Sequence, residues 1–402
     1  MSSLNNQLNN SEKGSRCEPF FTKVDPQKHC WIEISKKNFD NNASWLSQLI
    51  GPQRAIGAVV KSNAYGHGLP VVGQLCQDCP QISYLMVFLL SDAVMLRSQG
   101  VTKPILVLGG YDLPLEQAIV HDIDVAIYDQ ETLHDACRCV RELKQPLDIH
   151  LKIDTGLVRL GFLPEELPAV IAALQQLPLI AIKGIYSHFA ESDNVTDLTF
   201  TNLQLTRFGQ AITQCKEQGV AIPHVHLANT AATLRLPDTY WTMIRCGGAL
   251  YGTYKKELFY QEAQNRIPGF NLQPLLTLKS CIMAIKEVLA GTPIGYGCTY
   301  TASHAMRLAT VSIGYYDGLD RRLSNNGQVL LHNTIAPIIG RIGMNMMTID
   351  ITHIPQAQLH ETVTIIGNHD GVRLRDMAQR LDTIEYDIMT RLSANVPRSV
   401  IT

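Results

Sequence analysis

The sequence lacks two features that would point to a membrane or to a polyanionic partner. Its longest apolar run, YLMVFLLSDAVML, is interrupted by Asp92 and is too short to cross a bilayer, so it predicts a strand followed by a helix. Lys and Arg (34) nearly balance Asp and Glu (36), and the formal net charge is -2. Charge therefore gives no reason to expect nucleic acid or an anionic membrane, and a small-molecule substrate fits better.

The N-terminus lacks the marks of a secretory signal. Residues 1–28 begin with MSSLNNQLNNSEKGSR, which has neither a basic segment nor an apolar one. We expect this stretch to be a disordered polar tail and the protein to be cytoplasmic. Internal repeats of fixed period are also absent.

The cysteines lack the spacing of a metal site. Cys76 and Cys79 form one local pair and Cys137 and Cys139 another, but neither pair is accompanied by a second well-spaced pair of Cys or His. We therefore expect no metal, and we interpret the cysteines as reduced thiols at helix and core positions.

Between about residues 55 and 252, short apolar segments alternate with longer amphipathic ones. The strand candidates are AIGAVVK, YLMVFLL, PILVLGG, DVAIYD, LDIHLKID, IAIKGIYSHFA, HVHLAN and TMIRCGGALYG. Strands that alternate with helices predict a parallel sheet, and eight such units favour a closed (β/α)8 TIM-type barrel over an open doubly wound sheet. We assign residues 29–270 to this α/β barrel.

Beyond about residue 270 the sequence becomes strand-like and punctuated by glycine. The segments that show this are LTLKSCIMAIKEV, MRLATVSIGYY, GQVLLHNTIAPIIGRIGMNMMTIDIT and ETVTIIGNHDGV. Only RLRDMAQRLDTI is clearly helical. We therefore assign residues 271–402 to a separate, mainly β domain.

In a (β/α) barrel the working residues collect at the C-terminal ends of the strands, where the loops form one mouth. The polar residues at the predicted strand ends are Lys61, Lys152, Asp154, Arg159, His188, Asn229, Thr230 and Arg245. Lys61 has two interpretations, because a strand-end lysine is more often a surface cation than a nucleophile whose pKa is lowered by burial. Its flanking turn favours the nucleophile, since Gly66 and Gly68 allow close approach of a ligand and Tyr65 offers a hydroxyl.

The stretch AVVKSNAYGHG, residues 58–68, resembles the lysine signature of the pyridoxal phosphate-dependent alanine racemases. Further segments resemble the same family in order: LKIDTGLVRLGF, IYSHFAESD, HLANTAATLRLP, IRCGGALYG, IGYGCTYTA, SIGYYDG, GRIGMNMMTIDIT and TIEYDIMTRLSANVPR. The resemblance extends from about residue 31 to the C-terminus. It implies a barrel followed by a β domain, pyridoxal 5'-phosphate as cofactor, and interconversion of L-alanine and D-alanine, with D-alanine used for peptidoglycan.

The resemblance also implies which residues hold the cofactor. Lys61 would form the aldimine with it, and Arg245 would face its pyridine nitrogen and leave that nitrogen unprotonated. Glycines at a turn expose backbone N–H groups to a phosphate, and hydroxyl side chains complete such a site. The other residues implied as cofactor-binding are Tyr65, His188, Asn229, Thr230, Gly247, Gly248 and Tyr386.

Racemisation needs a base on each face of the substrate α-carbon. The resemblance assigns one base to Lys61 and the other to Tyr296, whose ordinary pKa of about 10 requires neighbours that stabilise its phenolate. It links Tyr296 to His188, and His188 to Arg245. It further implies that Tyr296 comes from the other subunit, so that we expect a homodimer with shared active sites.

Four more positions concern the substrate. Arg159 matches the family residue that binds the substrate carboxylate, for which a planar guanidinium is suited. Lys152 matches a position that is often a carbamylated lysine, and Met344 and Tyr315 match positions that contact substrate or line the entrance. Asn345 stands where the family usually has aspartate. A broader-spectrum racemase acting on serine or other amino acids therefore stays open as an alternative.

Two other functional classes are alternatives. Decarboxylases share the barrel-plus-β-domain plan, but they carry a cysteine-containing C-terminal site, and GRIGMNMM offers no cysteine. A non-enzymatic pyridoxal phosphate carrier consists of a lone barrel, so the second domain argues against that class.

Overall fold

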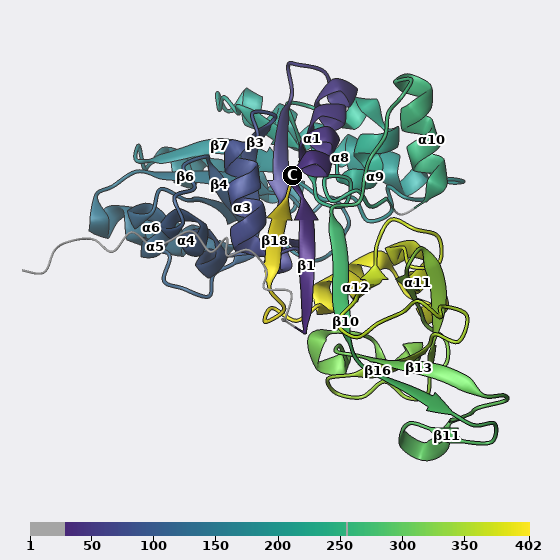
Figure 1. The fold of residues 1–402 in the computed structure, drawn as a ribbon. Helices are drawn as coiled ribbons and strands as arrows, with labels where there is room; N and C mark the ends of the chain where they lie inside the picture. Colours follow the sequence, from purple (N-terminus) through teal and green to yellow (C-terminus); the bar gives the residue numbers. More distant parts are fainter. Residues whose placement is uncertain (1–28, 255) are drawn as a thin grey trace, which may run out of the picture.

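Figure 1 shows the computed structural model of the chain, which describes residues 29–254 and 256–402. The expected tail, residues 1–28, lies outside the described residues. Two eight-stranded sheets and one two-stranded sheet make up the β structure of the described part. The first large sheet is surrounded by helices drawn in blue and teal, and the second lies mostly in the green and yellow C-terminal part.

The first sheet is a closed parallel barrel, which confirms the predicted fold class. Its strands are β2 (Ala55–Val59), β3 (Ile82–Leu89), β4 (Ile105–Gly110), β5 (Asp124–Ile127), β6 (Leu147–Lys152), β7 (Ile180–Tyr186), β8 (His224–His226) and β9 (Met243–Cys246). β9 pairs with β2 on one side. On the other side, its backbone meets the β8 segment through Arg245 N to Ala228 O (3.0 Å) and Thr242 N to Val225 O (3.2 Å), and these hydrogen bonds close the barrel.

Helices cover the outside of the barrel. They are α3 (Leu69–Asp78), α4 (Leu90–Ser98), α5 (Glu116–Val120), α6 (Gln130–Leu143), α7 (Leu167–Gln175), α8 (Thr199–Glu217), α9 (Thr230–Arg235) and α10 (Glu257–Arg266). α6 shows how the local sequence starts such a helix: the Asp129 carboxylate accepts a hydrogen bond from Thr132 N at 2.8 Å and caps the N-terminus of the helix. Leu133, Ala136 and Val140 then recur at helical spacing and are buried against the barrel.

The second sheet is mainly antiparallel, as expected for the C-terminal part. Its strands from this part are β10 (Leu276–Val288), β13 (Met306–Val311), β14 (Gln328–Leu331), β15 (Thr334–Ile339), β16 (Met347–Asp350), β17 (Thr362–Ile366) and β18 (Arg398–Ile401). A short pair, β11 (Pro293–Ile294) and β12 (Tyr300–Thr301), stands apart from it. Two helices, α11 (Leu374–Leu381) and α12 (Glu385–Arg391), lead back toward the barrel.

The first strand of the described chain does not pair with the barrel. β1 (Cys30–Ser35) lies antiparallel to β10 and parallel to β18, and Figure 1 shows the three strands side by side next to the barrel, where they form one edge of the second sheet. The chain then enters α1 (Lys36–Ile50) and joins the barrel at β2. We propose the division into residues 29–270 and 271–402, with β1 as a strand that the first part contributes to the second sheet.

Two searches of residues 29–254 and 256–402 bear on the function. Within these ranges no helix combines the length and the apolar character needed to cross a membrane. The same ranges contain no group of three or more His, Cys, Asp or Glu side chains placed to hold a metal ion. The two cysteine pairs are buried free thiols in and beside α3 and α6.

Candidate active site

A cavity of about 980 Å³ opens at the C-terminal ends of the barrel strands, where the fold predicts the site. Many of the predicted residues line it: Lys61, Tyr65, Lys152, Arg159, His188, Asn229, Thr230, Arg245, Gly247, Gly248 and Tyr386. They come from strand ends and from α12, so segments more than three hundred residues apart in the sequence share one cavity.

Lys61 follows β2 directly and points into this cavity, where it is half-buried. Burial lowers its pKa, and the nearby cations Arg159 and Arg245 lower it further. A lysine that loses its proton more easily than usual can act as a nucleophile or as a base. The structure therefore favours the second of the two interpretations of Lys61.

The turn after Lys61 has an unusual backbone. Four consecutive non-glycine residues, Ser62, Asn63, Ala64 and Tyr65, have φ values of 55°, 53°, 51° and 53°. This left-handed conformation costs roughly 1–2 kcal/mol per residue, so surrounding contacts must hold it. Within the turn, the Asn63 side chain accepts a hydrogen bond from Leu69 N at 2.8 Å.

The C-terminal strand clamps the same turn. The Arg398 guanidinium, which follows the last loop of the chain, donates from Nη2 to Gly66 O at 2.9 Å and from Nη1 to Ser393 O at 2.6 Å. A Cβ on Gly66 would overlap the Met389 carbonyl of α12, so the two segments touch backbone to backbone. The strained turn is thus held from the other end of the chain.

His67 supports this turn from beneath and does not line the cavity. Its Nδ1 lies 3.1 Å from both Ala64 O and Tyr65 O, and its ring stacks on Tyr251 at 4.5 Å. Because the side chain is fully buried, its pKa falls to about 4. A neutral imidazole therefore donates one hydrogen bond to the turn at neutral pH.

Gly247 and Gly248 form a cradle together with hydroxyl groups. A Cβ on Gly247 would lie 2.5 Å from the Tyr65 hydroxyl, and a Cβ on Gly248 would overlap the Tyr386 hydroxyl. The Thr230 hydroxyl lies at the same place and accepts a hydrogen bond from Ala249 N at 3.3 Å. Glycine at both positions thus lets the hydroxyls approach the backbone closely, which suits a phosphate.

Both phenols of the cradle keep their protons. Burial raises the pKa of Tyr386 to about 12, and burial also raises the pKa of Tyr65. The two rings meet edge to face with centroids 5.5 Å apart, which fixes their hydroxyls relative to each other. Two neutral O–H donors therefore face the cradle, as an anionic ligand requires.

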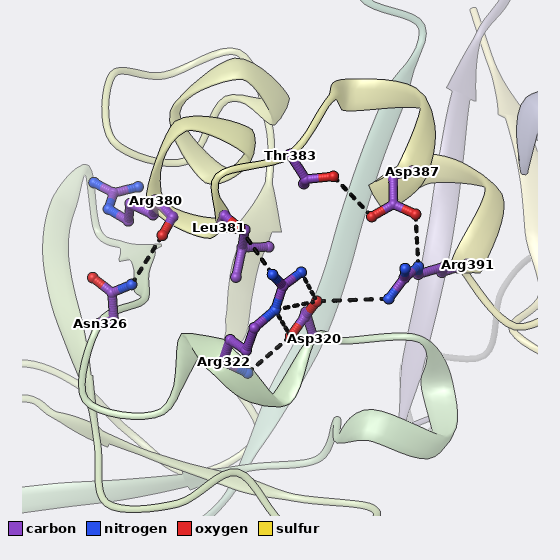
Figure 2. Close-up of polar contacts among 8 residues, drawn as sticks. All are labelled: Asp320, Arg322, Asn326, Arg380, Leu381, Thr383, Asp387 and Arg391. Atoms are coloured by element: carbon purple, nitrogen blue, oxygen red, sulfur yellow. Dashed lines mark hydrogen bonds and ion pairs between the residues drawn. The ribbon is translucent and has the colours of Figure 1, made fainter.

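Figure 2 shows how the C-terminal part holds α12, the helix that carries Tyr386. Asp387 of this helix accepts from Thr383 Oγ1 and from Arg391 Nε, each at 2.9 Å. Asp320, in turn, contacts Arg391 at 3.8 Å and pairs with Arg322, whose guanidinium also donates to the backbone at the end of α11. These partly exposed contacts are weak singly, but as a network they favour one orientation of α12.

Arg245, on β9, is buried, and its terminal nitrogens are fully engaged by the protein. Nη1 donates to His226 O (2.6 Å) and to His226 Nδ1 (3.2 Å), and Nη2 donates to Ser187 O (2.6 Å) and to His188 Nδ1 (3.1 Å). Burial lowers the Arg245 pKa to about 10, so the group stays charged at neutral pH. All its hydrogen bonds to the described residues come from Nη1 and Nη2, so the Nε–H remains as a donor of a residue that lines the cavity.

His188 links this guanidinium to the mouth of the cavity. Arginine only donates, so His188 Nδ1 must accept, and the ring proton is then on Nε2. Burial lowers the His188 pKa well below its usual value, and the charge of Arg245 lowers it further. A neutral imidazole therefore presents an Nε2–H donor beside the cavity.

Lys152 is a buried cation among other cations. Its Nζ lies over the Tyr186 ring at 4.6 Å, and no carboxylate among the described residues is within ion-pair distance of it. Burial lowers its pKa to about 7, with Arg245 and Arg159 as further causes. Such a position calls for a neutralising anion or for a neutral amine. Arg159 itself lies exposed at the rim of the cavity.

Asn229 lines the cavity, but its side-chain oxygen already accepts hydrogen bonds from within the protein. It caps α9 by accepting from Ala232 N at 3.1 Å, and it accepts from Ser192 Oγ at 3.0 Å. The prediction that Asn229 binds the cofactor is therefore limited to its amide nitrogen.

The single chain does not bring Tyr296, Tyr315 and Met344 into the cavity. They lie in the C-terminal part with exposed fractions of 73%, 42% and 55%. They are close to one another: Tyr315 N donates to Gly343 O at 3.1 Å, and a Cβ on Gly343 would lie 3.8 Å from the Tyr296 ring. Large exposed side chains gathered in this way are typical of an interaction surface. Asn345, next to Met344, is also exposed.

Comparison with known proteins identifies the family. The family described as alanine racemase, N-terminal domain, matches residues 34–255, and the family described as alanine racemase, C-terminal domain, matches residues 275–400. The chain belongs to the alanine racemase family. This result confirms the resemblance that the sequence motifs indicated.

Individual relatives of the family match over nearly their whole length. The alanine racemase of Methanococcus maripaludis is 36% identical over 373 residues, covering 92% of this chain and 97% of the relative. That of Syntrophobacter fumaroxidans is 37% identical over 370 residues, covering 91% and 96%. The solved structure of alanine racemase from Clostridium difficile 630 superposes with a TM-score of 0.87 at 31% identity, covering 94% of this chain and 97% of that one.

Some residues of this alanine racemase family site were not found from the sequence. Tyr186 forms a wall of the cavity and lies under both Lys152 and Arg245, with the Arg245 guanidinium 5.3 Å from its ring centre. Its place at the end of a predicted strand, beside His188, was the available signal. His226 could not be predicted as a site residue for a different reason. It does not line the cavity, and only its hydrogen bond with Arg245 in the folded protein connects it to the site.

Proposed function

We propose that the protein is a pyridoxal 5'-phosphate-dependent alanine racemase, which interconverts L-alanine and D-alanine. The observation that carries this proposal is one cavity with three features: Lys61, an Arg245 Nε–H donor without a protein partner, and the glycine cradle with its hydroxyls. These features suit the aldehyde, the ring nitrogen and the phosphate of the cofactor respectively. The names of the relatives support alanine as substrate.

In this proposal each part of the cofactor has its own residues. Thr230, Tyr65, Tyr386 and the amides around Gly247 and Gly248 would hold the phosphate, because hydroxyls and exposed amides donate to phosphate oxygens. Asn229 contributes its amide nitrogen. When bound, the cofactor supplies an aldehyde that reacts with amines and a ring that disperses negative charge from the substrate α-carbon.

Arg245 would determine the protonation state of the cofactor's ring nitrogen. A guanidinium with a pKa of about 10 keeps its proton at neutral pH, so its Nε–H would donate to the ring nitrogen of a bound cofactor and would leave that nitrogen unprotonated. Charge at the α-carbon would then be dispersed less, which would favour return of a proton to the α-carbon over other reactions.

Two opposed bases move the proton at the α-carbon. Lys61, whose pKa is lowered by burial, is one of them. We assign the other to the Tyr296 hydroxyl of a second copy of the chain, because within one chain this side chain is exposed and does not line the cavity. The His188 Nε2–H is placed to stabilise that phenolate. A homodimer with shared sites follows.

Arg159 binds the substrate carboxylate, and Lys152 keeps it in place. A neutral amine with a pKa of about 7 attacks carbon dioxide, forming an N–C bond and releasing one proton, and the product is a carbamate with one negative charge. That charge neutralises the cations that now surround Lys152. Met344 and Tyr315 of the second copy narrow the entrance, which supports a small substrate side chain. The relatives named above are alanine racemases, so the broader substrate range is not favoured in spite of Asn345.

The cellular setting is part of the proposal. The cysteines of the described ranges are free thiols, which suits the reducing cytoplasm. D-alanine made there would serve the synthesis of peptidoglycan.

The test is incubation of the purified, cofactor-loaded protein with L-alanine in deuterium oxide. We expect D-alanine with deuterium at the α-carbon, and no reaction with a Lys61→Ala variant. Absence of both D-alanine and deuterium from alanine would refute the proposal. Release of carbon dioxide from a diamino acid would point to a decarboxylase instead.

A further inference from the structure

A chain of polar groups runs from Arg245 into the interior of the barrel, beneath the cavity. Arg245 Nη1 is 3.2 Å from His226 Nδ1, and His226 Nε2 is 2.9 Å from His150 Nδ1. His150 Nε2 lies 3.5 Å from the Asp124 carboxylate. His226 and His150 are fully buried, Asp124 is 7% exposed, and none of the three lines the cavity.

The hydrogen bonds of this chain have one possible direction. Arginine only donates, so His226 Nδ1 accepts and the His226 proton is on Nε2. His226 then donates to His150 Nδ1, which leaves the His150 proton on Nε2. This nitrogen lies 3.5 Å from the Asp124 carboxylate and makes no hydrogen bond among the described residues, so Asp124 acts on it through its charge. Burial lowers the His226 pKa far below its usual value, so this ring is neutral. Each hydrogen bond from the guanidinium to His150 thus has a donor and an acceptor, and the chain ends at a carboxylate whose charge favours a proton on the His150 Nε2 that faces it.

The barrel makes room for these groups and encloses them. Gly184 on β7 is the register partner of His150, and a Cβ there would overlap the His150 ring. Tyr186 stacks on His226 with centroids 4.9 Å apart and 2° between the planes. At the far end, Tyr84 donates to the Asp124 carboxylate, and His224 stacks on His150 at 6.0 Å. Because the His226 and His150 rings are fully buried, the loss of a hydrogen-bond partner of either ring is costly.

We propose that His150 and Asp124 are positioning residues for Arg245: they hold His226 in its Nε2–H tautomer, so that Nδ1 accepts from the guanidinium. With the opposite tautomer, an imidazole N–H would face an arginine N–H, and the guanidinium would have to turn away. The Nε–H that faces the cavity would turn with it. The effect on turnover rests on the proposed function, whereas the tautomers of the two histidines do not.

The first test is nitrogen NMR of the protein labelled with 15N-histidine, both with and without cofactor. The His226 and His150 signals are assigned from variants that lack each ring. We expect both rings to be neutral, with the proton on Nε2, in both forms of the protein. A proton on Nδ1 of either ring, or a positively charged ring, overturns the proposal.

The second test compares two substitutions at one position. Asn at position 150 can accept from His226 through Oδ1, where the imidazole accepted through Nδ1, whereas Leu cannot. We expect His150→Leu to lower kcat/KM for alanine by about tenfold to a hundredfold and to move the His226 proton to Nδ1. We expect His150→Asn to keep most of the kcat/KM of the unaltered protein and to keep the His226 proton on Nε2. Weaker cofactor binding by the Leu variant should accompany the loss.

The outcomes separate the two proposals. If the unaltered protein does not racemise alanine, the proposed function fails, while the NMR result still decides the tautomers. If the unaltered protein is active, and His150→Leu keeps the same kcat/KM and the same His226 tautomer, the positioning role is refuted. A drop in melting temperature equal for Leu and Asn, with equal loss of activity, also refutes it, because the role would then be structural only.

Discussion

The glycine cradle allows a prediction whose size follows from the geometry. In a Gly247→Ala variant, the new Cβ would lie 2.5 Å from the Tyr65 hydroxyl oxygen, 2.8 Å from Cζ and 3.2 Å from Cε2. Ordinary contact needs a further displacement of about 1 Å. The Gly247 backbone does not have a positive φ, so alanine brings no backbone strain and the effect is confined to the cradle.

Tyr65 cannot absorb this displacement without loss. Its ring packs against Tyr251 at 5.0 Å and Tyr386 at 5.5 Å, and its backbone belongs to the clamped left-handed turn. The hydroxyl would therefore leave the cradle, and with it one hydrogen bond to a charged phosphate, worth about 1.5–3 kcal/mol. This corresponds to roughly tenfold to a hundredfold weaker binding of the cofactor.

The assay is titration of the cofactor-free protein with pyridoxal 5'-phosphate, followed by visible absorbance. Gly209→Ala is the matched control, because Gly209 lies in α8 with nothing within 4 Å of its added Cβ. We expect unchanged cofactor binding in the control and weaker binding in Gly247→Ala. Equal dissociation constants for the two variants would show that the cradle does not hold the phosphate.

Three further predictions concern the second base, the buried lysine and the buried histidine of the turn. Tyr296→Phe should keep the fold and the cofactor absorbance, because the side chain is 73% exposed, but lose at least about a hundredfold in kcat for alanine; unchanged kcat would exclude it as a base. Removal of carbon dioxide should raise KM for alanine, and added bicarbonate should restore it, if Lys152 carries a carbamate; a KM insensitive to both would exclude that. His67 has a folded pKa of about 4, below its unfolded value of about 6.5, so the unfolded chain binds more protons between these values. The free energy of unfolding should therefore fall as the pH drops from about 6.5 to 4, measured by denaturant titration, and His67→Gln should show a smaller decrease; equal decreases would contradict this.

The barrel could be predicted because its strands are buried on both faces. Segments such as AIGAVVK and PILVLGG are continuous apolar runs bounded by amphipathic helices, and this pattern is local in the sequence. The pairing of β1 could not be predicted in the same way. Its partners β10 and β18 are more than 200 residues away in the sequence. Nothing in the apolar segment CWIEIS itself indicates which sheet it joins.

The sequence predicted a site residue wherever a residue type with suitable chemistry stood at the end of a predicted strand. Lys61, Arg245 and His188 met that condition, and they lie together in the cavity. The left-handed turn was only partly visible, because glycine and asparagine suggest such a conformation whereas Ala64 and Tyr65 do not. The link from His226 to His150 depends on ring orientation inside the barrel, which single-sequence patterns do not contain.

The most direct test of the proposed shared site mixes two variants that should be inactive. If Lys61 and Tyr296 are the two bases of a site built from two chains, neither the Lys61→Ala homodimer nor the Tyr296→Phe homodimer has a complete site. When the two are unfolded together and refolded at equal amounts, half of the dimers should be mixed, and each mixed dimer has one complete site. We predict recovery of about a quarter of the unaltered alanine racemisation. No recovery, with mixed dimers demonstrably formed, would contradict the assignment of Lys61 and Tyr296 to one site built from two chains.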